Sequence, residues 1–153
     1  MIWCEKNHVV QGKAPVADAF AGTAYSDVVN CKNYGHLTFL IVKGVGTTGT
    51  STITVNACDD TTPTTEAAVA FHYRRIQTSD NSPGTLTAAT TAGFTTTAGS
   101  DEIYVIEVDP AELAKNGYGY CRLVATEVVD AAVLGGIIAI LSEPRYGAVA
   151  AIA

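Results

Sequence analysis

The strongest pattern in the chain is an apolar run over residues 36–43, His-Leu-Thr-Phe-Leu-Ile-Val-Lys. Its β-branched and aromatic residues favour a strand, in which alternate side chains point to the same face. One face carries Leu37, Phe39 and Ile41. Leu40 and Val42 make the opposite face apolar as well. The pattern therefore predicts a strand that is buried on both sides, or one that contacts another subunit through Leu40 and Val42.

Residues 51–58 also alternate, with apolar side chains on one face and Thr or Asn on the other. A Gly- and Thr-rich stretch over residues 44–50 separates the two runs and supplies turn residues. Because two such runs joined by a short turn are typical of a hairpin, the sequence predicts a β-hairpin over residues 36–58.

Further strands are predicted along the rest of the chain. Five apolar or β-branched runs carry the signal, at residues 26–31, 68–74, 103–108, 118–127 and 133–141. Leu86 and Phe94 anchor two weaker strands in a stretch dominated by Thr, Ala, Ser and Gly. One helix signal follows Asp109, since Asp caps helices and Pro110 suits the first helical position. Short strands without βαβ alternation indicate an all-β fold, a jelly-roll-like β-sandwich with one short helix near 110–115.

The first 24 residues show no sustained periodicity, and Gly12 and Pro15 interrupt them. We expect residues 1–24 to form an extended N-terminal arm, with Trp3 and Phe20 contacting a neighbouring subunit. A terminus folded back on its own domain is the alternative that the sequence leaves open. No domain boundary interrupts the remainder, so residues 25–153 are expected to form a single β-sandwich domain.

Composition limits the classes of partner. The chain is 48% hydrophobic and 16% charged, against about 25% charged in typical soluble domains. Loops of Thr, Ser and Gly, or a protein partner, would therefore cover much of the surface. A net charge of −6 disfavours nucleic-acid binding, which needs a basic patch. The N-terminus lacks the pattern of a secretory signal, and the longest apolar stretch, residues 131–141, falls short of the roughly 20 residues that span a bilayer. We expect neither nucleic acid nor a membrane as a partner.

The residues that usually carry chemistry are scattered. The cysteines at positions 4, 31, 58 and 121 form no C-x-x-C pair and have no His at zinc-ligand spacing. We expect free, mostly buried thiols and no metal site. His8, His36 and His72 stand alone, without a nucleophile motif such as G-x-S-x-G. The sequence thus predicts no catalytic residues and no enzyme.

Two further ligand signals are weak. The acidic residues Asp59, Asp60, Asp80, Asp101 and Glu102 lack the spacing of a calcium loop, so we interpret them as solvated turn residues. The glycine-rich stretch 44–49 joins two strands and lacks the Lys-Ser/Thr of a phosphate loop. No cofactor is therefore expected.

Aromatic residues offer one alternative function. Tyr25, Tyr34, Tyr118, Tyr120 and Trp3 could form a platform on which a sugar stacks, as in carbohydrate-binding β-sandwiches. Aromatic residues on strands are more often core or interface residues.

Two groups of segments carry a resemblance. Ala-Tyr-Ser-Asp-Val-Val-Asn-Cys-Lys-Asn-Tyr at 24–34 leads through an apolar strand and a Gly/Thr turn to Val-Asn-Ala-Cys-Asp-Asp at 55–60. Ile-Glu-Val-Asp-Pro-Ala-Glu-Leu at 106–113 leads to Tyr-Cys-Arg-Leu at 120–123 and Ala-Ile-Leu-Ser-Glu-Pro-Arg-Tyr at 139–146. Together they resemble small virion proteins of tailed bacteriophages, particularly β-sandwich capsid decoration (cement) proteins.

That resemblance implies a jelly-roll-like homo-trimer or homo-dimer, assembled in the host cytoplasm and bound in the virion where major capsid subunits meet. The first hypothesis is therefore a structural virion protein of the capsid decoration type, whose partners are the major capsid protein or other virion proteins. A neck, head-to-tail connector or tail component is the alternative within the virion. A carbohydrate-binding module is the alternative of another class. Candidate interface residues are Trp3, Phe20, Leu40 and Val42.

Overall fold

The computed structural model describes residues 2–77 and 79–146. A 3-10 helix, Trp3–Glu5, precedes thirteen strands and one α-helix in the described chain. These elements are β1 (His8–Val16), β2 (Thr23–Tyr25), β3 (Val29–Asn30), β4 (Tyr34–Gly46), β5 (Thr50–Cys58), β6 (Glu66–Val69), β7 (Phe71–Gln77), β8 (Ser82–Pro83), β9 (Thr87–Ala89), β10 (Phe94–Thr95), β11 (Glu102–Val108), α1 (Pro110–Ala114), β12 (Tyr120–Val129) and β13 (Val133–Pro144).

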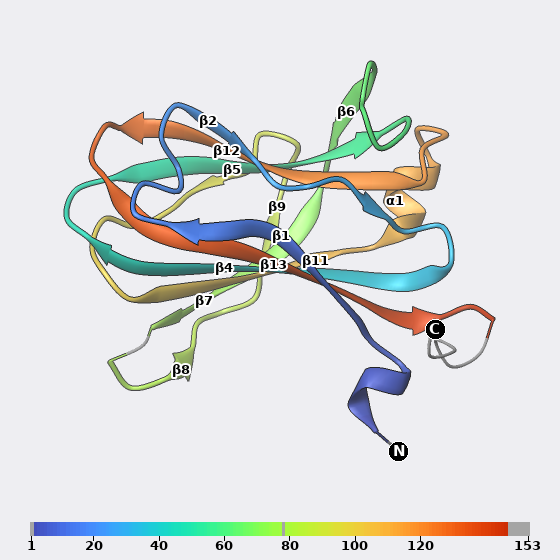
Figure 1. Cartoon of the computed structure of the whole chain (residues 1–153), viewed down its shortest axis with the longest axis horizontal. Coiled ribbons are helices and arrows are strands. Elements are labelled where there is room, and N and C mark those ends of the chain that lie inside the picture. Colours follow the sequence, from blue (N-terminus) through green and yellow to red (C-terminus); the bar gives the residue numbers. More distant parts are fainter. Residues whose placement is uncertain (1, 78, 147–153) are drawn as a thin grey trace.

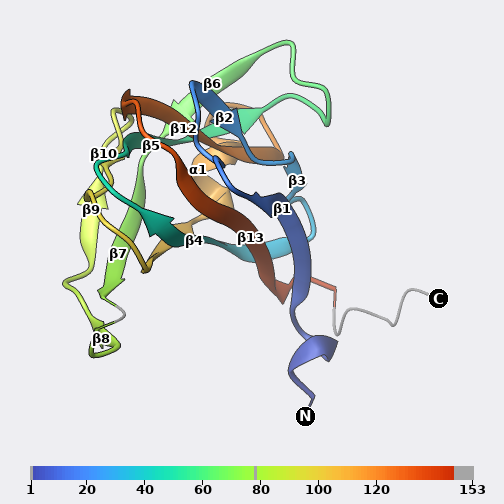
Figure 2. The same ribbon diagram turned by 60° about the vertical axis from the view of Figure 1, so that its left-hand side comes forward.

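The strands form two antiparallel sheets that pack face to face (Figures 1 and 2). The seven-stranded sheet has the order β1-β13-β4-β11-β7-β8, with β9 also pairing with β7. The six-stranded sheet has the order β10-β5-β12-β2, with β3 on β12 and β6 on β5. Alternate side chains of both sheets meet in one core, which is the arrangement of a β-sandwich.

Successive strands cross between the sheets in jelly-roll order. The chain alternates between the sheets from β1 through β5 if β2 and β3 are taken together, and again from β11 through β13, while β6 lies beside β5. The interleaved sets are β1-β13-β4-β11 and β2-β12-β5-β6, the double Greek-key arrangement of jelly rolls. The predicted fold class is therefore confirmed. The short helix is confirmed too, because the Asp109 side chain accepts a hydrogen bond from the Ala111 N–H at 2.8 Å and caps α1.

The predicted hairpin over residues 36–58 is wrong. β4 pairs with β13 and β11 in one sheet, whereas β5 pairs with β12, β10 and β6 in the other. The short connection crosses the sandwich, and a side chain on Gly49 would lie 2.3 Å from the Ala131 carbonyl oxygen. Alternation showed correctly which face of each strand is buried, but it does not specify the neighbouring strand.

From His8 onward, the N-terminal segment is part of the sandwich and does not form the predicted arm. β1 pairs with β13, with His8 opposite Leu141 and Gln11 opposite Ile138. The Ala19 N–H donates to the Val133 carbonyl at 2.9 Å. The domain thus begins near residue 8, and the folded-back alternative describes residues 8–24. The arm is reduced to residues 2–7, which project from the body (Figures 1 and 2).

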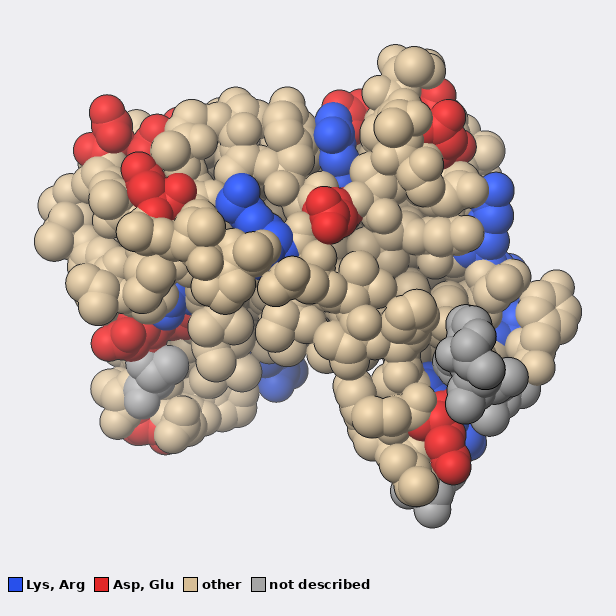
Figure 3. Space-filling model, in the orientation of Figure 1, with Lys and Arg blue, Asp and Glu red and all other residues tan. Residues whose placement is uncertain are grey.

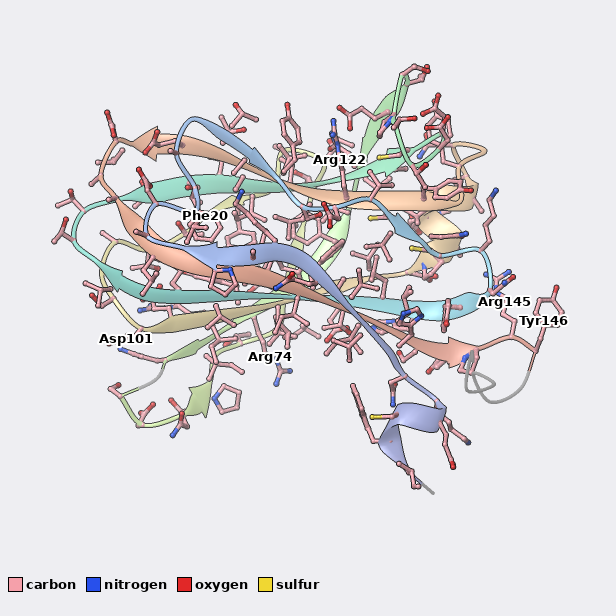
Figure 4. All side chains as sticks on the ribbon, in the orientation of Figure 1. Phe20, Arg74, Asp101, Arg122, Arg145 and Tyr146 are labelled. Atoms are coloured by element: carbon pink, nitrogen blue, oxygen red, sulfur yellow. The ribbon has the colours of Figure 1, made fainter. Side chains whose placement is uncertain are left out.

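Phe20 is a core residue, so its predicted role as a contact to a neighbouring subunit is wrong for this chain. Its side chain is 5% exposed and lies between the two sheets (Figure 4). Gly135 makes room for it, because a Cβ at that position would lie 2.7 Å from the ring. The isolated Phe in an aperiodic segment gave no indication of this packing.

The predicted strand over residues 68–74 divides into β6 and β7, because the chain passes from one sheet to the other at Ala70. Leu86 is 48% exposed and precedes β9, whereas Phe94 begins β10 and stacks on Tyr73. Residues 78 and 147–153 of the predicted domain lie outside the described residues. Within the described residues, no helix has the length and apolarity to cross a membrane.

Candidate protein-docking face

The outer face of the seven-stranded sheet is apolar, although no other layer of strands or helices in the described residues covers it. The inward side chains of β4, β11 and β13 fill the core, so the alternate side chains point outward. We call this outward set the apolar face, and its members are Val9, Leu40, Val42, Ile76, Ile103, Val105, Leu134, Ile138 and Ile140. The outer face of the other sheet instead carries polar side chains such as Thr52, Thr54, Asn56 and Arg122.

Strand register brings these side chains together across the sheet. Leu40 lies between Ile138 on β13 and Val105 on β11. In the next row, Val42 lies between Gly136 and Ile103. Leu40 is half-buried and Val42 is 40% exposed. The two residues predicted from the pattern of β4 therefore lie at the centre of an exposed apolar surface.

A groove of about 360 Å³ lies within this face. Its walls include Pro15, Val42, Leu134 and Ile138, and Gly136 also lines it. β1 bulges after Gln11 and leans over Gly136, since a Cβ on Gly136 would lie 3.1 Å from Pro15. Because a water molecule occupies about 30 Å³ of liquid, the groove has room for side chains of a partner.

Two positively charged side chains lie at the edges of the apolar face. Lys13 lines the groove at the β1 edge, and none of the described residues that line the groove is acidic. Arg74 lies on β7 opposite Val105, at the other edge, and points away from the second sheet (Figure 4). Among the described residues, neither cation has an ion-pair partner. In a chain of net charge −6, this face therefore has the opposite sign from the molecule as a whole.

Glu107 is the acidic residue that points outward from β11, and it is already engaged. Its carboxylate accepts a hydrogen bond from the Thr38 hydroxyl at 2.9 Å and is paired with the His36 ring. His72 lies beside Glu107 on β7 and is exposed. These residues form a polar border at one end of the apolar face. They place His36 and His72 on the same surface, whereas His8 lies near Tyr34 at the start of β1.

The space-filling view shows the outline of this side of the molecule. The lower border in Figure 3 is indented between the lobe that holds β8 and the lobe formed by the N-terminal segment. Uncharged residues make up most of the visible indentation. The 3-10 helix in the second lobe buries none of its residues, and Trp3 is 52% exposed. Trp3 therefore lies at the surface, and its contact with a neighbouring subunit stays a prediction.

The structure also contains a buried polar network that was not predicted from the sequence. Lys43 and Glu102 are each 4% exposed, with the Lys43 ammonium 3.7 Å from a Glu102 oxygen. Arg75 pairs with the other Glu102 oxygen, and the Tyr104 hydroxyl donates to the carboxylate at 2.7 Å. Lys43 also donates to the Thr97 carbonyl at 2.6 Å. Burial is the main cause of the lowered pKa of Lys43, and the adjacent Glu102 carboxylate opposes it.

The position of this network indicates a structural role. It joins β4, β7 and β11 to the segment after β10, at the end of the core. A signal for it does exist in the sequence, because Lys43 continues the inward series that includes Phe39 and Ile41. Glu102 begins the inward series of β11 in the same way. Opposite charges at inward positions of two apolar strands predict a buried pair.

Three thiols are buried at the opposite end of the sandwich. Cys31, Cys58 and Cys121 are at most 1% exposed, whereas Cys4 is exposed. Burial raises the pKa of the Cys31 thiol to about 12 and that of Cys58 to about 11, and it raises the pKa of Cys121 well above its usual value. The prediction that the thiols are mostly buried is confirmed.

We expect one thiol of the native protein to react rapidly with dithiobis(nitrobenzoate) at neutral pH, and four after unfolding in guanidinium. Thiolates are the reactive species, and burial with a raised pKa suppresses them at three of the four positions. Absorbance of the released thionitrobenzoate counts the equivalents. In Cys4→Ser the rapid phase should disappear. A rapid phase that persists in this variant would contradict the assignment.

The acidic residues of the sequence analysis do not converge. Within their own loop, Asp59 accepts hydrogen bonds from Thr64 and Asp60 accepts one from the Thr62 N–H. Asp80 accepts from Ser82, and Glu102 belongs to the buried network. Among the described residues, no group of three or more His, Cys, Asp or Glu side chains is placed to hold a metal ion.

The aromatic residues are also divided between surfaces. Tyr25 ends β2 opposite Val124, and Tyr120 begins β12. Arg122 covers the Tyr25 ring at 4.1 Å, and Lys32 covers the Tyr120 ring at 4.5 Å. Tyr34 packs with His8 at the β1 edge, and Tyr118 packs against the core. Between described residues, no ring contact joins Tyr25, Tyr118 and Tyr120. The structure therefore does not assemble these rings into one platform.

Comparison with known proteins gives structural likenesses only. No protein-family model and no curated protein sequence matches the chain. The YomS protein derived from the SPBc2 prophage is similar in structure, with a TM-score of 0.48, 12% identity, and coverage of 88% of this chain and 91% of that one. The CBM22-1–GH10 modules of Clostridium thermocellum xylanase 10B give a TM-score of 0.39 at 12% identity, covering 93% of this chain and 27% of that one.

The VP2 subviral particle of infectious bursal disease virus gives a TM-score of 0.27 at 9% identity, with coverage of 91% of this chain and 41% of that one. All three TM-scores are below 0.5, so these likenesses carry no argument about function. The resemblance to phage decoration proteins stays a prediction from the sequence, and the case for function rests on the geometry of the apolar face.

Proposed function

We propose that this chain is a structural protein of a tailed-phage virion, of the capsid decoration type, which stabilises the shell at contacts between major capsid subunits. The observation that carries the proposal is the apolar face around Leu40 and Val42. Contiguous exposed apolar surface of this kind is typical of protein contacts, because leaving it in water is unfavourable. The segments that resemble decoration proteins give the proposal its virion setting.

The rest of the molecule suits this role. The core is one continuous cluster that joins both sheets, and β4 contributes to the core on one side and to the apolar face on the other. A contact made through a central strand is supported by strands on both sides. Such a surface binds without rearrangement, as a protein that reinforces a shell requires.

The test is a quantitative mass-spectrometric count of this chain against the major capsid protein in purified particles from its source. A decoration protein is expected in a ratio near that of the shell subunits. A few copies per hundred shell subunits would instead support a neck, connector or tail component. Absence from particles would contradict both virion roles.

The carbohydrate-binding alternative gains no support from the side chains. A sugar stacking on Tyr25 or Tyr120 would have to displace Arg122 or Lys32 from the ring faces that they cover. Glycan-array binding by the purified chain, lost in Tyr25→Ala or Tyr120→Ala, is the result that would revive it.

A further inference from the structure

We infer that the first half of β1, residues 8–11, binds an extended segment of another polypeptide. The segment adds to the seven-stranded sheet as a further strand and places an apolar side chain in a cleft between the two sheets. This binding surface is distinct from the apolar face, so it goes beyond the proposed function. Three features carry it: unpaired backbone groups at the edge, edge protection that is confined to the second half of β1, and the cleft beside the first half.

β1 is the terminal strand of its sheet. Among the described residues, β13 is the strand that pairs with it, in regular register over residues 8–11. The Gly12 carbonyl points away from β13 and accepts a hydrogen bond from the Asp27 N–H at 2.6 Å. Since alternate residues of a strand direct their N–H and C=O groups to the same side, those of His8 and Val10 also point to the free side. A row of backbone donors and acceptors matches another extended backbone, which identifies the ligand as a polypeptide.

The features that protect a free sheet edge lie in the second half of β1. Proteins protect such edges with proline, lysine and bulges. β1 bulges after Gln11 and again after Lys13, and Pro15 has no N–H to offer. The hydrogen bond from Asp27 closes the same half at Gly12. Residues 8–11 have none of these features, so a straight stretch of about 13 Å is open to pairing.

A cleft of about 300 Å³ lies beside the open half, between β1 and β3 (Figure 2). β3 has two residues, and the cleft forms where this short strand faces β1. Val10 points into the core, yet it is half-buried because it lines the cleft. Apolar and polar side chains both line this space, and they are Val10, Val28, Val29 and Leu141, with His8, Asn30, Asn33 and Tyr34.

Strand pairing fixes which side chain of the added segment enters the cleft. Side chains of paired residues lie on the same face of a sheet. A residue added opposite Val10 therefore points into the cleft, toward the buried Val29 and Leu141. Residues added opposite Val9 and Gln11 face outward instead, beside the apolar face.

The cleft selects an uncharged side chain. None of the described residues that line it is Asp, Glu, Lys or Arg. The charged residues nearest in sequence to this lining, Lys6, Lys13, Asp27 and Lys32, lie outside it. A charged side chain in the cleft would lose water without gaining an ionic partner, which is unfavourable. The partner is therefore an extended segment with an aliphatic residue between uncharged neighbours.

The test uses the purified chain and a random library of peptides of about ten residues, displayed on ribosomes. We expect enriched peptides to carry this pattern and to bind with a Kd of about 100 µM or tighter. In the free protein, the Val10 amide should exchange with deuterium rapidly and the Gln11 amide slowly, as measured by NMR, because Gln11 bonds to β13. Bound peptide should protect the Val10 amide and leave the exchange of Gln11 unchanged.

Variants on both sides of the cleft test the geometry. Val10→Pro removes one N–H from the free side and leaves the pairing with β13 in place, so it should weaken peptide binding at least about tenfold. Val10→Thr is the matched control, because it keeps the N–H and nearly the same shape, and it should retain binding. Asn33→Trp fills the cleft without changing β1 and should weaken binding as much as Val10→Pro. Circular dichroism checks that each variant is folded.

Four results would overturn the inference: slow exchange of the Val10 amide in the free protein, no enriched peptide of the stated affinity, binding that persists in Asn33→Trp, or enriched peptides that are charged at the cleft position. Protection of Val10 that appears as the protein concentration rises, without peptide, would identify a second copy as the occupant and would also contradict it. None of these results affects the copy number in particles, so failure here is distinguishable from failure of the proposed function.

Discussion

Replacing Glu102 with Gln is expected to lower the free energy of unfolding by about 3–5 kcal/mol, as measured by denaturant titration at neutral pH. The change removes the carboxylate that balances Lys43, an ammonium that is 4% exposed and cannot reach water without disrupting the core. An uncompensated buried charge is far more costly than a lost surface pair. Arg75 suffers less, because its side chain is 35% exposed.

The matched control is Glu107→Gln on the same strand. Glu107 is also paired and hydrogen-bonded, yet its side chain is 33% exposed and points to the outer face. We expect a loss below about 1 kcal/mol there. The double variant Lys43→Met/Glu102→Leu should be more stable than Glu102→Leu alone, because it removes both charges. Equal losses at Glu102 and Glu107, or no recovery in the double variant, would contradict the account of the buried pair.

The sequence was informative about which residues are buried and less so about which strands are neighbours. Leu37, Phe39 and Ile41 are at most 1% exposed, as their alternation predicts. The same alternation placed Leu40 and Val42 outward, at what proved to be the centre of the apolar face. Pairing between strands far apart in sequence, such as β4 with β13, depends on the packing of the whole core and leaves no local signal.

Two parts of the candidate site, the groove and the charges at its edges, could not be predicted from the sequence for the same reason. The groove depends on the bulged end of β1 leaning over Gly136, and neither the bulge nor the neighbour of Gly136 can be inferred from local pattern. Lys13 and Arg74 are 61 positions apart in sequence and share one face only because β13, β4 and β11 lie between their strands. The apolar outer side of β4 was therefore predictable, but the charges and the groove beside it were not.

Alkaline pH is expected to destabilise the fold well before lysine side chains in general lose their charge. The folded state holds protons on Cys31, Cys58 and Cys121 that the unfolded chain releases near pH 9. Their stabilising contribution is complete below pH 9 and is lost as pH rises toward the folded pKa values, about 11 for Cys58 and about 12 for Cys31. Each thiol accounts for about 1.4 kcal/mol per pH unit in that window, or roughly 4 kcal/mol together at pH 10.

The two other shifted groups of the core act in opposite directions. The lowered pKa of Lys43 means that the folded state releases this proton first, which adds stability as pH approaches 10.5 and offsets part of the loss. The raised pKa of Tyr104 adds to the loss above pH 10. The net effect between pH 8 and 10 is therefore a decrease that is smaller than the thiol sum.

Guanidinium titrations at a series of pH values between 8 and 11 give the slope of stability against pH, which separates this effect from ordinary packing losses. Cys31→Ala is less stable at every pH because it leaves a cavity, but its slope should fall by the share of one thiol. Cys4→Ala, at an exposed position, should keep the slope of the wild type. A wild-type slope in Cys31→Ala would mean that buried thiols do not control the alkaline limit, and that Tyr104 must account for it instead.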